Sequence, residues 1–263
     1  MGLFNKKPPL DKEWEKLLKE ESKFLVARVE KKDSLINRKL AEVVPEKLQG
    51  TLDTAFAKAF GLIFDKGTGI IEKTYKKEEL EKNFQINQYI NEVRHDAKSL
   101  KVFSKKAKQS GNFNLLASGV SGVGMGVLGI GIPDIPVFIG MVLKSMYEIA
   151  LNYGFRYDTE EERYFILMVI EGAVSHGDEM LRINEKIDAF MKNSVLPENY
   201  DRESQIKKTS ASLSKELLYM KFLQGVPVVG AVGGAYDAVY MKQITSYANL
   251  KYKHRFLRKK FKR

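Results

Sequence analysis

Residues 114–143 read NLLASGVSGVGMGVLGIGIPDIPVFIGMVL, and Asp134 is the one charged residue in this run. An apolar run of this length is sufficient to cross a bilayer core, which takes about 20 residues. Pro133 and Pro136 flank Asp134 and interrupt the run before its last third, so neither piece is a standard spanning helix. Two structures remain open: a bent hairpin inside a membrane, or a pair of glycine-rich helices buried in protein.

A second glycine-rich stretch, residues 217–240, repeats this layout, because Pro227 is followed by Gly230 and Gly234 among other small residues. Small residues spaced four apart make a flat helix face on which another backbone packs closely. Glycine costs about 1 kcal/mol in a helix interior in water, so close packing or lipid has to compensate. We predict that residues 114–143 and 217–240 form adjacent helices whose glycine faces are in contact.

The remaining sequence predicts helices from end to end, and no segment shows convincing strand alternation. We therefore expect an all-α multi-helix bundle in which the two glycine-rich segments pack together, whether inside a membrane or inside protein. A helical extension at residues 1–44 is expected to precede an α-helical domain at 45–263, which ends in a basic tail at 251–263. Residues 110–112, Ser-Gly-Asn, predict a turn before the first glycine-rich run.

Two local signals mark helix ends in the middle of the chain. Gly154 follows a helical pattern at the position where a left-handed C-cap is expected. Thr159 and Glu162 have the S/T-x-x-E spacing of a capping box, which predicts a helix beginning at Glu160.

The net charge of +11 is concentrated at the C-terminus. Phe256, Leu257 and Phe261 are interleaved there with eight cations and no carboxylate: Lys251, Lys253, Arg255, Arg258, Lys259, Lys260, Lys262 and Arg263. A basic segment with aromatic residues suits an anionic membrane surface, at about 1 kcal/mol per cation. Contact with nucleic-acid phosphates and a merely solvated terminus are the alternatives, and no motif indicates specific nucleic-acid recognition.

Catalytic and metal-binding patterns are few. The G-x-G-x-x-G at 124–129 has no preceding strand, so it does not indicate a nucleotide site. His176, Asp178 and Glu179, with Glu171 one turn earlier, are the one group that a metal could use, and a helix N-terminus explains the acids better. Cysteine is absent. We therefore predict no catalytic residue, metal or cofactor.

Two carboxylates in apolar surroundings are the strongest functional candidates, since such a group is costly unless it is paired. Asp134 is expected to cap the helix that begins at Ile135 by accepting backbone amides from about Val137. Asp237 would lie within a helix, where capping is not available. It is expected to pair with a cation or a tyrosine, the candidates being Arg163, Lys144 and Tyr147.

Several motifs together resemble the EcsC protein family over roughly residues 45–257. They are G-I-P-D-I-P at 131–136, Tyr153-Gly154, Glu162-Arg163, V-P-V-V-G-A-V-G-G-A at 226–235 and Tyr247-Ala248. The same pattern is similar to the membrane-associated C-terminal domains of some bacterial GTPases. The resemblance implies a bacterial protein linked to ABC-type transport or secretion, and it carries no catalytic motif. Asp237 departs from the amide residue that is usual at its position.

These observations together predict a non-enzymatic accessory or regulatory protein at the cytoplasmic face of the cell membrane. Its expected partners are anionic lipid and, through the resemblance, a membrane transporter complex. An integral hairpin protein that moves or senses a small solute is the first alternative. An uncharacterised hydrolase is the second.

Overall fold

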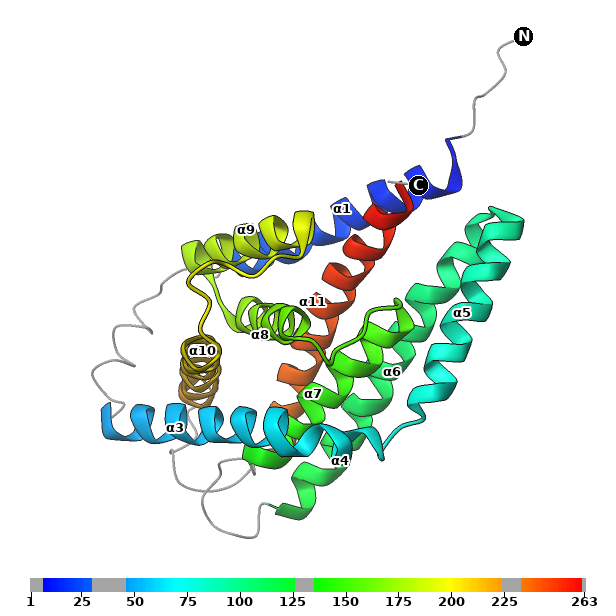
Figure 1. The fold of residues 1–263 in the computed structure, drawn as a ribbon. Coiled ribbons are helices and arrows are strands. Elements are labelled where there is room, and N and C mark those ends of the chain that lie inside the picture. The colour runs from blue at the N-terminus through cyan, green and yellow to red at the C-terminus, as the bar shows by residue number, and fades with distance from the viewer. Residues whose placement is uncertain (1–6, 30–45, 126–134, 224–232, 262–263) are drawn as a thin grey trace.

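The computed structural model describes residues 7–29, 46–125, 135–223 and 233–261, with side chains given outside 112–134 and 220–237. Every regular element in these ranges is helical, which confirms the all-α fold class (Figure 1). The elements are α1 (Pro9–Val29), α3 (Glu46–Leu62), the π-helical turn η1 (Ile63–Gly67), α4 (Thr68–Glu72), α5 (Lys77–Arg94), α6 (Ala97–Met125), α7 (Ile135–Asn152), α8 (Glu160–Val174), α9 (Gly177–Asn193), α10 (Arg202–Leu223) and α11 (Gly233–Phe261).

Helices α7 and α8 form the centre of the core. Apolar residues surround α7 on most sides, and Ile139, Val142 and Leu143 have no exposed surface. Among the described helices, α7 is the one long and apolar enough to cross a membrane, and 72% of that window is buried inside the protein. Burial of this kind is also what the core helix of a bundle shows, so α7 leaves the choice between lipid and protein surroundings open.

The longest packing interface joins α6 to α11, which are the two longest helices. The prediction of a turn at residues 110–112 is wrong, because α6 runs without a break from Ala97 to Met125. Gly111 serves helix packing instead: a Cβ added there would lie 3.3 Å from Thr245 Cβ on α11. The missing side chain lets the two helices approach closely.

Parts of the two glycine-rich segments lie beside each other, since α7 and α11 pack together and the rings of Phe138 and Tyr240 are 6.5 Å apart. Contact between the glycine faces themselves lies outside the described side chains. The same holds for several of the candidate residues. Pro133, Asp134, Pro227 and Gly230 lie outside the described residues. Gly234 and Asp237 belong to α11, but their side chains are not described. Pro136 is the second residue of α7 and is exposed.

Both predicted helix-end signals are present. Gly154 has a φ of +75°, and a Cβ added there would lie 2.1 Å from the Cζ atom of Phe84. Thr159 is the N-cap of α8, and its hydroxyl accepts a hydrogen bond from the Glu162 amide at 3.3 Å. The Glu162 side chain does not complete the capping box, because it turns toward α11 instead.

The first helix is integrated into the bundle. Helix α1 packs against α6, α9 and α11, and its Leu17 is completely buried. The described part of the expected extension at residues 1–44 therefore shares one core with the domain that follows it. Figure 1 also places the start of α1 next to the end of α11.

Candidate functional site: the basic end of the last helix

The basic C-terminal segment is the last part of α11, and half of it is buried. The helix continues to Phe261, and Lys251, Lys253 and Arg255 are at most 7% exposed. Tyr252, Phe256 and Leu257 from the same segment belong to the hydrophobic core. The alternative of a solvated tail is wrong for these three residues, and they are not free to reach a lipid surface as predicted, because they pair with carboxylates on other helices.

Arg255 forms a buried ion pair with Glu162. Its Nη1 lies 2.7 Å and 2.9 Å from the two carboxylate oxygens of Glu162, and the Tyr252 hydroxyl donates to the same carboxylate at 2.6 Å. The guanidinium also lies between the rings of Phe155 and Phe165, at 4.1 Å and 4.2 Å from their centroids. A planar cation in contact with two aromatic faces suits arginine better than lysine.

The other two buried cations fasten α1 to α11. Lys253 Nζ donates to Glu13 at 3.0 Å, and Lys251 Nζ lies 3.3 Å from Glu21 and 2.9 Å from Asp188. His254 Nδ1 lies 3.0 Å from the same Glu21 carboxylate. Burial alone would raise the pKa of Glu21, but the hydrogen bond with His254 and the charge of Lys251 outweigh it and lower that pKa.

The sequence carried one signal of this arrangement that our interpretation missed. Glu13, Leu17 and Glu21 are spaced four apart, so they share one face of α1, and all three are buried. Acids at regular spacing around a core leucine indicate that cations from elsewhere will meet that face. The composition of the C-terminal segment alone could not identify those cations.

The less buried remainder of the basic segment begins at Arg258, where Arg258 and Lys260 are half-buried and Lys259 is exposed. A surface cavity of about 610 Å³ opens there, and it is lined by Asp11, Trp14, Glu15, His254, Arg258 and Phe261. The Trp14 ring contacts both His254 and Phe261 edge-on, with centroids 4.8 Å and 5.4 Å apart. We call these six residues the terminal cluster. Its aromatic pair suits the boundary between water and lipid headgroups, and its charged side chains are Arg258, Asp11 and Glu15.

The two neighbouring lysines rest on aromatic rings. Lys259 Nζ lies 4.3 Å from the Phe155 ring centroid, and Lys260 Nζ lies 5.1 Å from that of Phe256. Burial, followed by repulsion from Arg255, lowers the pKa of Lys259. Lys262 and Arg263, which were also predicted to bind lipid, lie outside the described residues.

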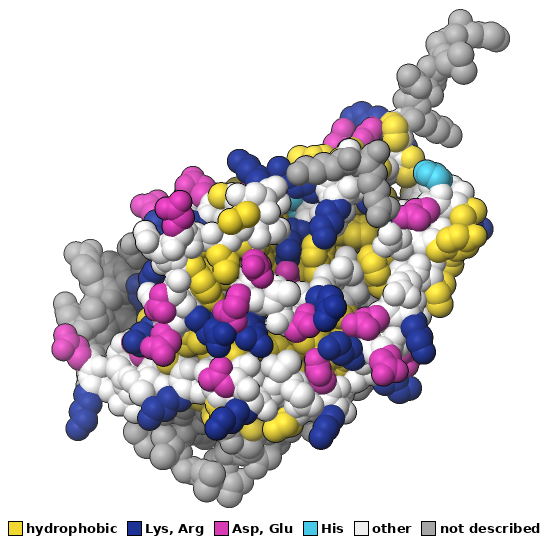
Figure 2. All heavy atoms as spheres, in the orientation of Figure 1, with side chains coloured by type: hydrophobic (Ala, Val, Ile, Leu, Met, Phe, Trp, Pro, Cys, Tyr) yellow, Lys and Arg dark blue, Asp and Glu magenta, His cyan; other side chains and the backbone are white. Residues whose placement is uncertain are grey.

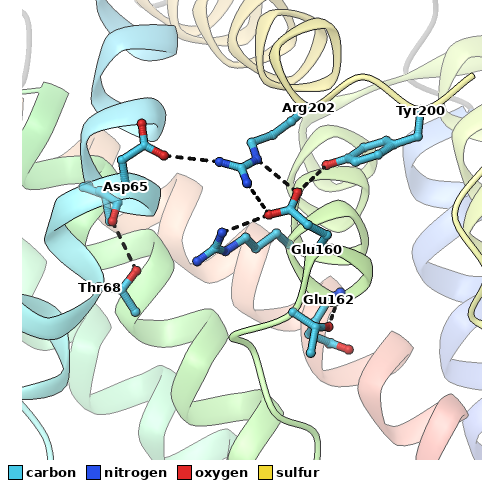
Figure 3. A network of polar contacts seen from close by, with 9 residues as sticks. Asp65, Thr68, Glu160, Glu162, Tyr200 and Arg202 are labelled. Carbon is cyan, nitrogen blue, oxygen red and sulfur yellow. Dashed lines mark hydrogen bonds and ion pairs between the residues drawn. The ribbon is translucent and has the colours of Figure 1, made fainter.

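A second polar network gathers at the start of α8 (Figure 3). Glu160 accepts hydrogen bonds from Arg202 and from Arg163, the latter at 2.9 Å, and Arg202 also reaches Asp65 at 3.2 Å. Burial acts to raise the pKa of Glu160, but the hydrogen bonds from the two arginines lower it overall. Glu160 and Glu162 thus use the two faces of one helix turn to hold α10 and α11.

A groove of about 760 Å³ lies between α3 and α10 beside this network. Its lining contains three cations and three carboxylates: Lys58, Arg202, Lys207, Asp53, Asp65 and Glu203. The charges balance, and Arg202 and Asp65 are already paired with each other. The groove therefore has no electrostatic preference for an anionic ligand.

The residues considered for metal binding are held apart by separate partners. Glu171 accepts from Gln205 at 2.7 Å, His176 faces Glu216 at 3.5 Å, and Glu179 pairs with Arg182. Burial raises the pKa of Glu171. Within the described part of the chain, no cluster of three or more histidines and carboxylates could hold a metal ion.

The partners that we expected for Asp237 have other contacts. Arg163 bonds to Glu160, Lys144 lies 3.9 Å from Glu148, and Tyr147 stacks on Tyr157 at 4.0 Å between centroids. Asp134 directly precedes α7, as an N-cap would, but its own geometry lies outside the described residues. Both carboxylate predictions stay untested.

Comparison with known proteins settles the family. The family model described as "EcsC protein family" matches residues 11–257. The chain belongs to the EcsC protein family. The match begins inside α1, earlier than the resemblance at about residue 45 suggested, and it ends within the basic segment of α11.

The EcsC assignment is accompanied by one curated relative, which is described as "Uncharacterized protein YdbA" from Bacillus subtilis (strain 168). It is 25% identical over 245 residues, which is 87% of this chain and 84% of the relative. No solved structure matches this chain.

Proposed function

We propose that this EcsC-family chain is a non-enzymatic accessory or regulatory protein that binds the inner, cytoplasmic surface of the cell membrane. In this proposal the terminal cluster contacts acidic lipid, and the two glycine-rich segments pack together. The link to ABC-type transport or secretion rests on the family resemblance. The membrane contact rests on the residues of the chain itself.

One observation carries the membrane contact. At the end of α11, Arg258 and Phe261 meet Trp14 at an open cavity, and Phe261 is 44% exposed. An exposed aromatic side chain costs little in the headgroup region of a bilayer, and adjacent cations add about 1 kcal/mol each on an acidic surface. The buried cations Lys251, Lys253 and Arg255 contribute to stability in this proposal, and lipid contact falls to the exposed end.

Vesicle co-sedimentation tests the proposal with the full-length chain. Truncation before Lys251 is unsuitable because it would also remove Tyr252, Arg255 and Phe256 from the core. The variant Arg258→Gln/Lys260→Gln keeps those residues. We expect it to bind phosphatidylserine-containing vesicles about thirtyfold more weakly than wild type, from about 1 kcal/mol for each lost cation.

The matched control is Lys207→Gln/Lys208→Gln, which removes two exposed cations from α10. It should bind like wild type. Equal binding by all three proteins would refute the role of the terminal cluster, and no binding by wild type would refute the membrane proposal as a whole.

Extraction from cell membranes separates the surface protein from an integral one. A protein held by surface charge should be released by high salt. Release by alkaline carbonate but not by salt would point to deeper apolar contact. A requirement for detergent would favour the integral hairpin, with residues 114–143 in the bilayer.

A further inference from the structure

We propose that the outer face of the α5–α6 hairpin is a second membrane-binding surface, whose apolar residues enter the headgroup region of an acidic bilayer. This inference rests on the proposed membrane function and adds a surface separate from the terminal cluster. The apolar residues are Ile86, Tyr89, Ile90 and Val93 of α5, which we call the α5 stripe.

The α5 stripe faces solvent although its residues are apolar. Ile86, Tyr89 and Val93 are 57%, 69% and 63% exposed. Their spacing places the four stripe residues on a single helix face. Scattered exposed apolar residues are ordinary, whereas four along one helix face mark an interaction surface.

The opposite face of α5 is already used by the fold. Phe84 packs against Phe103 of α6, with ring centroids 5.6 Å apart, and Asn91 is buried and donates a hydrogen bond to Ser99 at 3.0 Å. A buried asparagine opposite exposed isoleucine and valine is the reverse of an ordinary surface helix. The packing of α5 therefore leaves its stripe without a function in the described fold.

Charge on the neighbouring helix indicates an anionic partner. Lys98, Lys101, Lys105 and Lys108 recur three or four residues apart on α6, and all four are exposed. Buried Leu100, Phe103 and Ala107 lie on the other side of that helix. The sequence contains no carboxylate between Asp96 and Asp134, so α6 itself adds no negative charge to this lysine row, and Lys101 lies 3.8 Å from Glu13 of α1.

The shape of the surface favours a bilayer over a protein partner. Figure 1 shows α5 at the outer edge of the molecule, and Figure 2 shows apolar side chains gathered at that edge. A protruding helix with an apolar face and nearby lysines can lie in the interfacial plane of a membrane, roughly 5–10 Å deep. Tyr89 suits that depth, because tyrosine is enriched at membrane interfaces.

The hairpin and the terminal cluster lie at the same end of the molecule. Figure 1 shows the α5–α6 turn, the start of α1 and the end of α11 at the upper right of the molecule. Phe256 of α11 contacts both Phe84 and Phe103, at centroid distances of 6.4 Å and 4.5 Å. One flat membrane could therefore contact both surfaces, and two contacts bind more tightly than either alone.

Tryptophan fluorescence can report on each surface separately. Trp14 is the single tryptophan, so its emission in the wild-type chain follows the terminal cluster. In the variant Trp14→Phe/Tyr89→Trp, emission follows the α5 stripe instead. On adding vesicles of phosphatidylcholine with phosphatidylserine, we expect the Trp at position 89 to shift to the blue and to be quenched by brominated lipid.

Vesicle binding by substituted proteins tests the contributions of the α5 stripe and of the lysine row on α6. Ile86→Ser/Val93→Ser should weaken binding at least tenfold, because each loses apolar surface worth about 1 kcal/mol or more. Its matched control is Ile70→Ser/Val195→Ser, which alters two equally exposed apolar residues elsewhere. Lys105→Gln/Lys108→Gln should weaken binding about thirtyfold on acidic vesicles, and Lys207→Gln/Lys208→Gln is again the control.

The outcomes separate this inference from the function on which it rests. If wild-type protein binds acidic vesicles while stripe and lysine variants bind equally well, and position 89 gives no shift, the inference is overturned and the terminal cluster stands alone. If wild-type protein does not bind vesicles, both fail. A stripe variant that changes the oligomeric state without vesicles would show that a second copy covers α5, which also overturns the inference.

Discussion

Replacing Arg255 by methionine should destabilise the fold strongly, because it leaves the Glu162 carboxylate buried without its cation. Glu162 is 5% exposed and Arg255 is 7% exposed. Removing one partner of a buried ion pair costs about 3–5 kcal/mol. Glu162 retains the hydrogen bond from the Tyr252 hydroxyl at 2.6 Å, and it lies in the first turn of α8, where the helix dipole favours a carboxylate. We therefore expect the lower end of that range, about 3 kcal/mol.

A double-mutant cycle measured by chemical denaturation isolates the pair. Adding Glu162→Gln to Arg255→Met removes the unpaired charge, so the double variant should recover about 2 kcal/mol relative to Arg255→Met alone. Arg255→Lys keeps the charge but loses the contact of the planar guanidinium with the Phe155 and Phe165 rings, so it should have an intermediate cost. A loss under about 1 kcal/mol for Arg255→Met, as for exposed pairs, or strict additivity in the cycle, would refute the reasoning.

Three further predictions concern stability and use thermal or chemical denaturation. Gly154→Ala should cost about 2 kcal/mol or more, since φ is positive there and the new methyl would collide with Phe84. Glu171→Gln should stabilise the protein at neutral pH, because burial raises the pKa of Glu171 and its ionisation opposes folding. Glu21 has a lowered pKa, so its contribution is present above the usual glutamate pKa and is lost as pH falls through the folded-state value; Glu21→Gln should therefore cost less in acid.

Each of these predictions has its own control. Gly69→Ala introduces a methyl with no atom within 4 Å and should be neutral or slightly stabilising. Equal effects of Gly69→Ala and Gly154→Ala on stability would refute the predicted collision with Phe84. The gain from Glu171→Gln should vanish below the usual glutamate pKa, where the carboxyl is protonated in both states. A Glu21→Gln effect that does not change with pH would show that packing, rather than charge, holds that side chain.

Local signals in the sequence were sufficient to predict the two helix ends at Gly154 and Thr159. Gly154 and Thr159 act through atoms within a few residues, so short motifs predict them. Ser110–Asn112 looked like a turn on the same local grounds, but Gly111 is needed for the approach of Thr245, which is far away in the chain. A glycine in a helical pattern is ambiguous until its packing partner is known.

The basic segment shows where sequence reasoning on function stops. Its charge was correctly located, but whether a lysine is solvated or buried depends on a carboxylate elsewhere, as Lys253 and Glu13 show. The α5 stripe is the opposite case: a helical repeat of apolar residues usually faces inward, yet Tyr89 and Val93 are exposed. Only tertiary structure shows which face of that helix the bundle uses.

The ion pairs between α1 and α11 have a consequence for biosynthesis. Lys253 and Glu13 are separated by 240 positions, so the first helix meets its partner only after about 240 further residues have been synthesised. At typical elongation rates of about 5–20 residues per second, α1 waits roughly 10–50 seconds, with its core leucine unburied. A chain released early from the ribosome never gains the cations that α1 requires. Premature termination anywhere before α11 should therefore yield an incompletely folded product that cellular proteases remove.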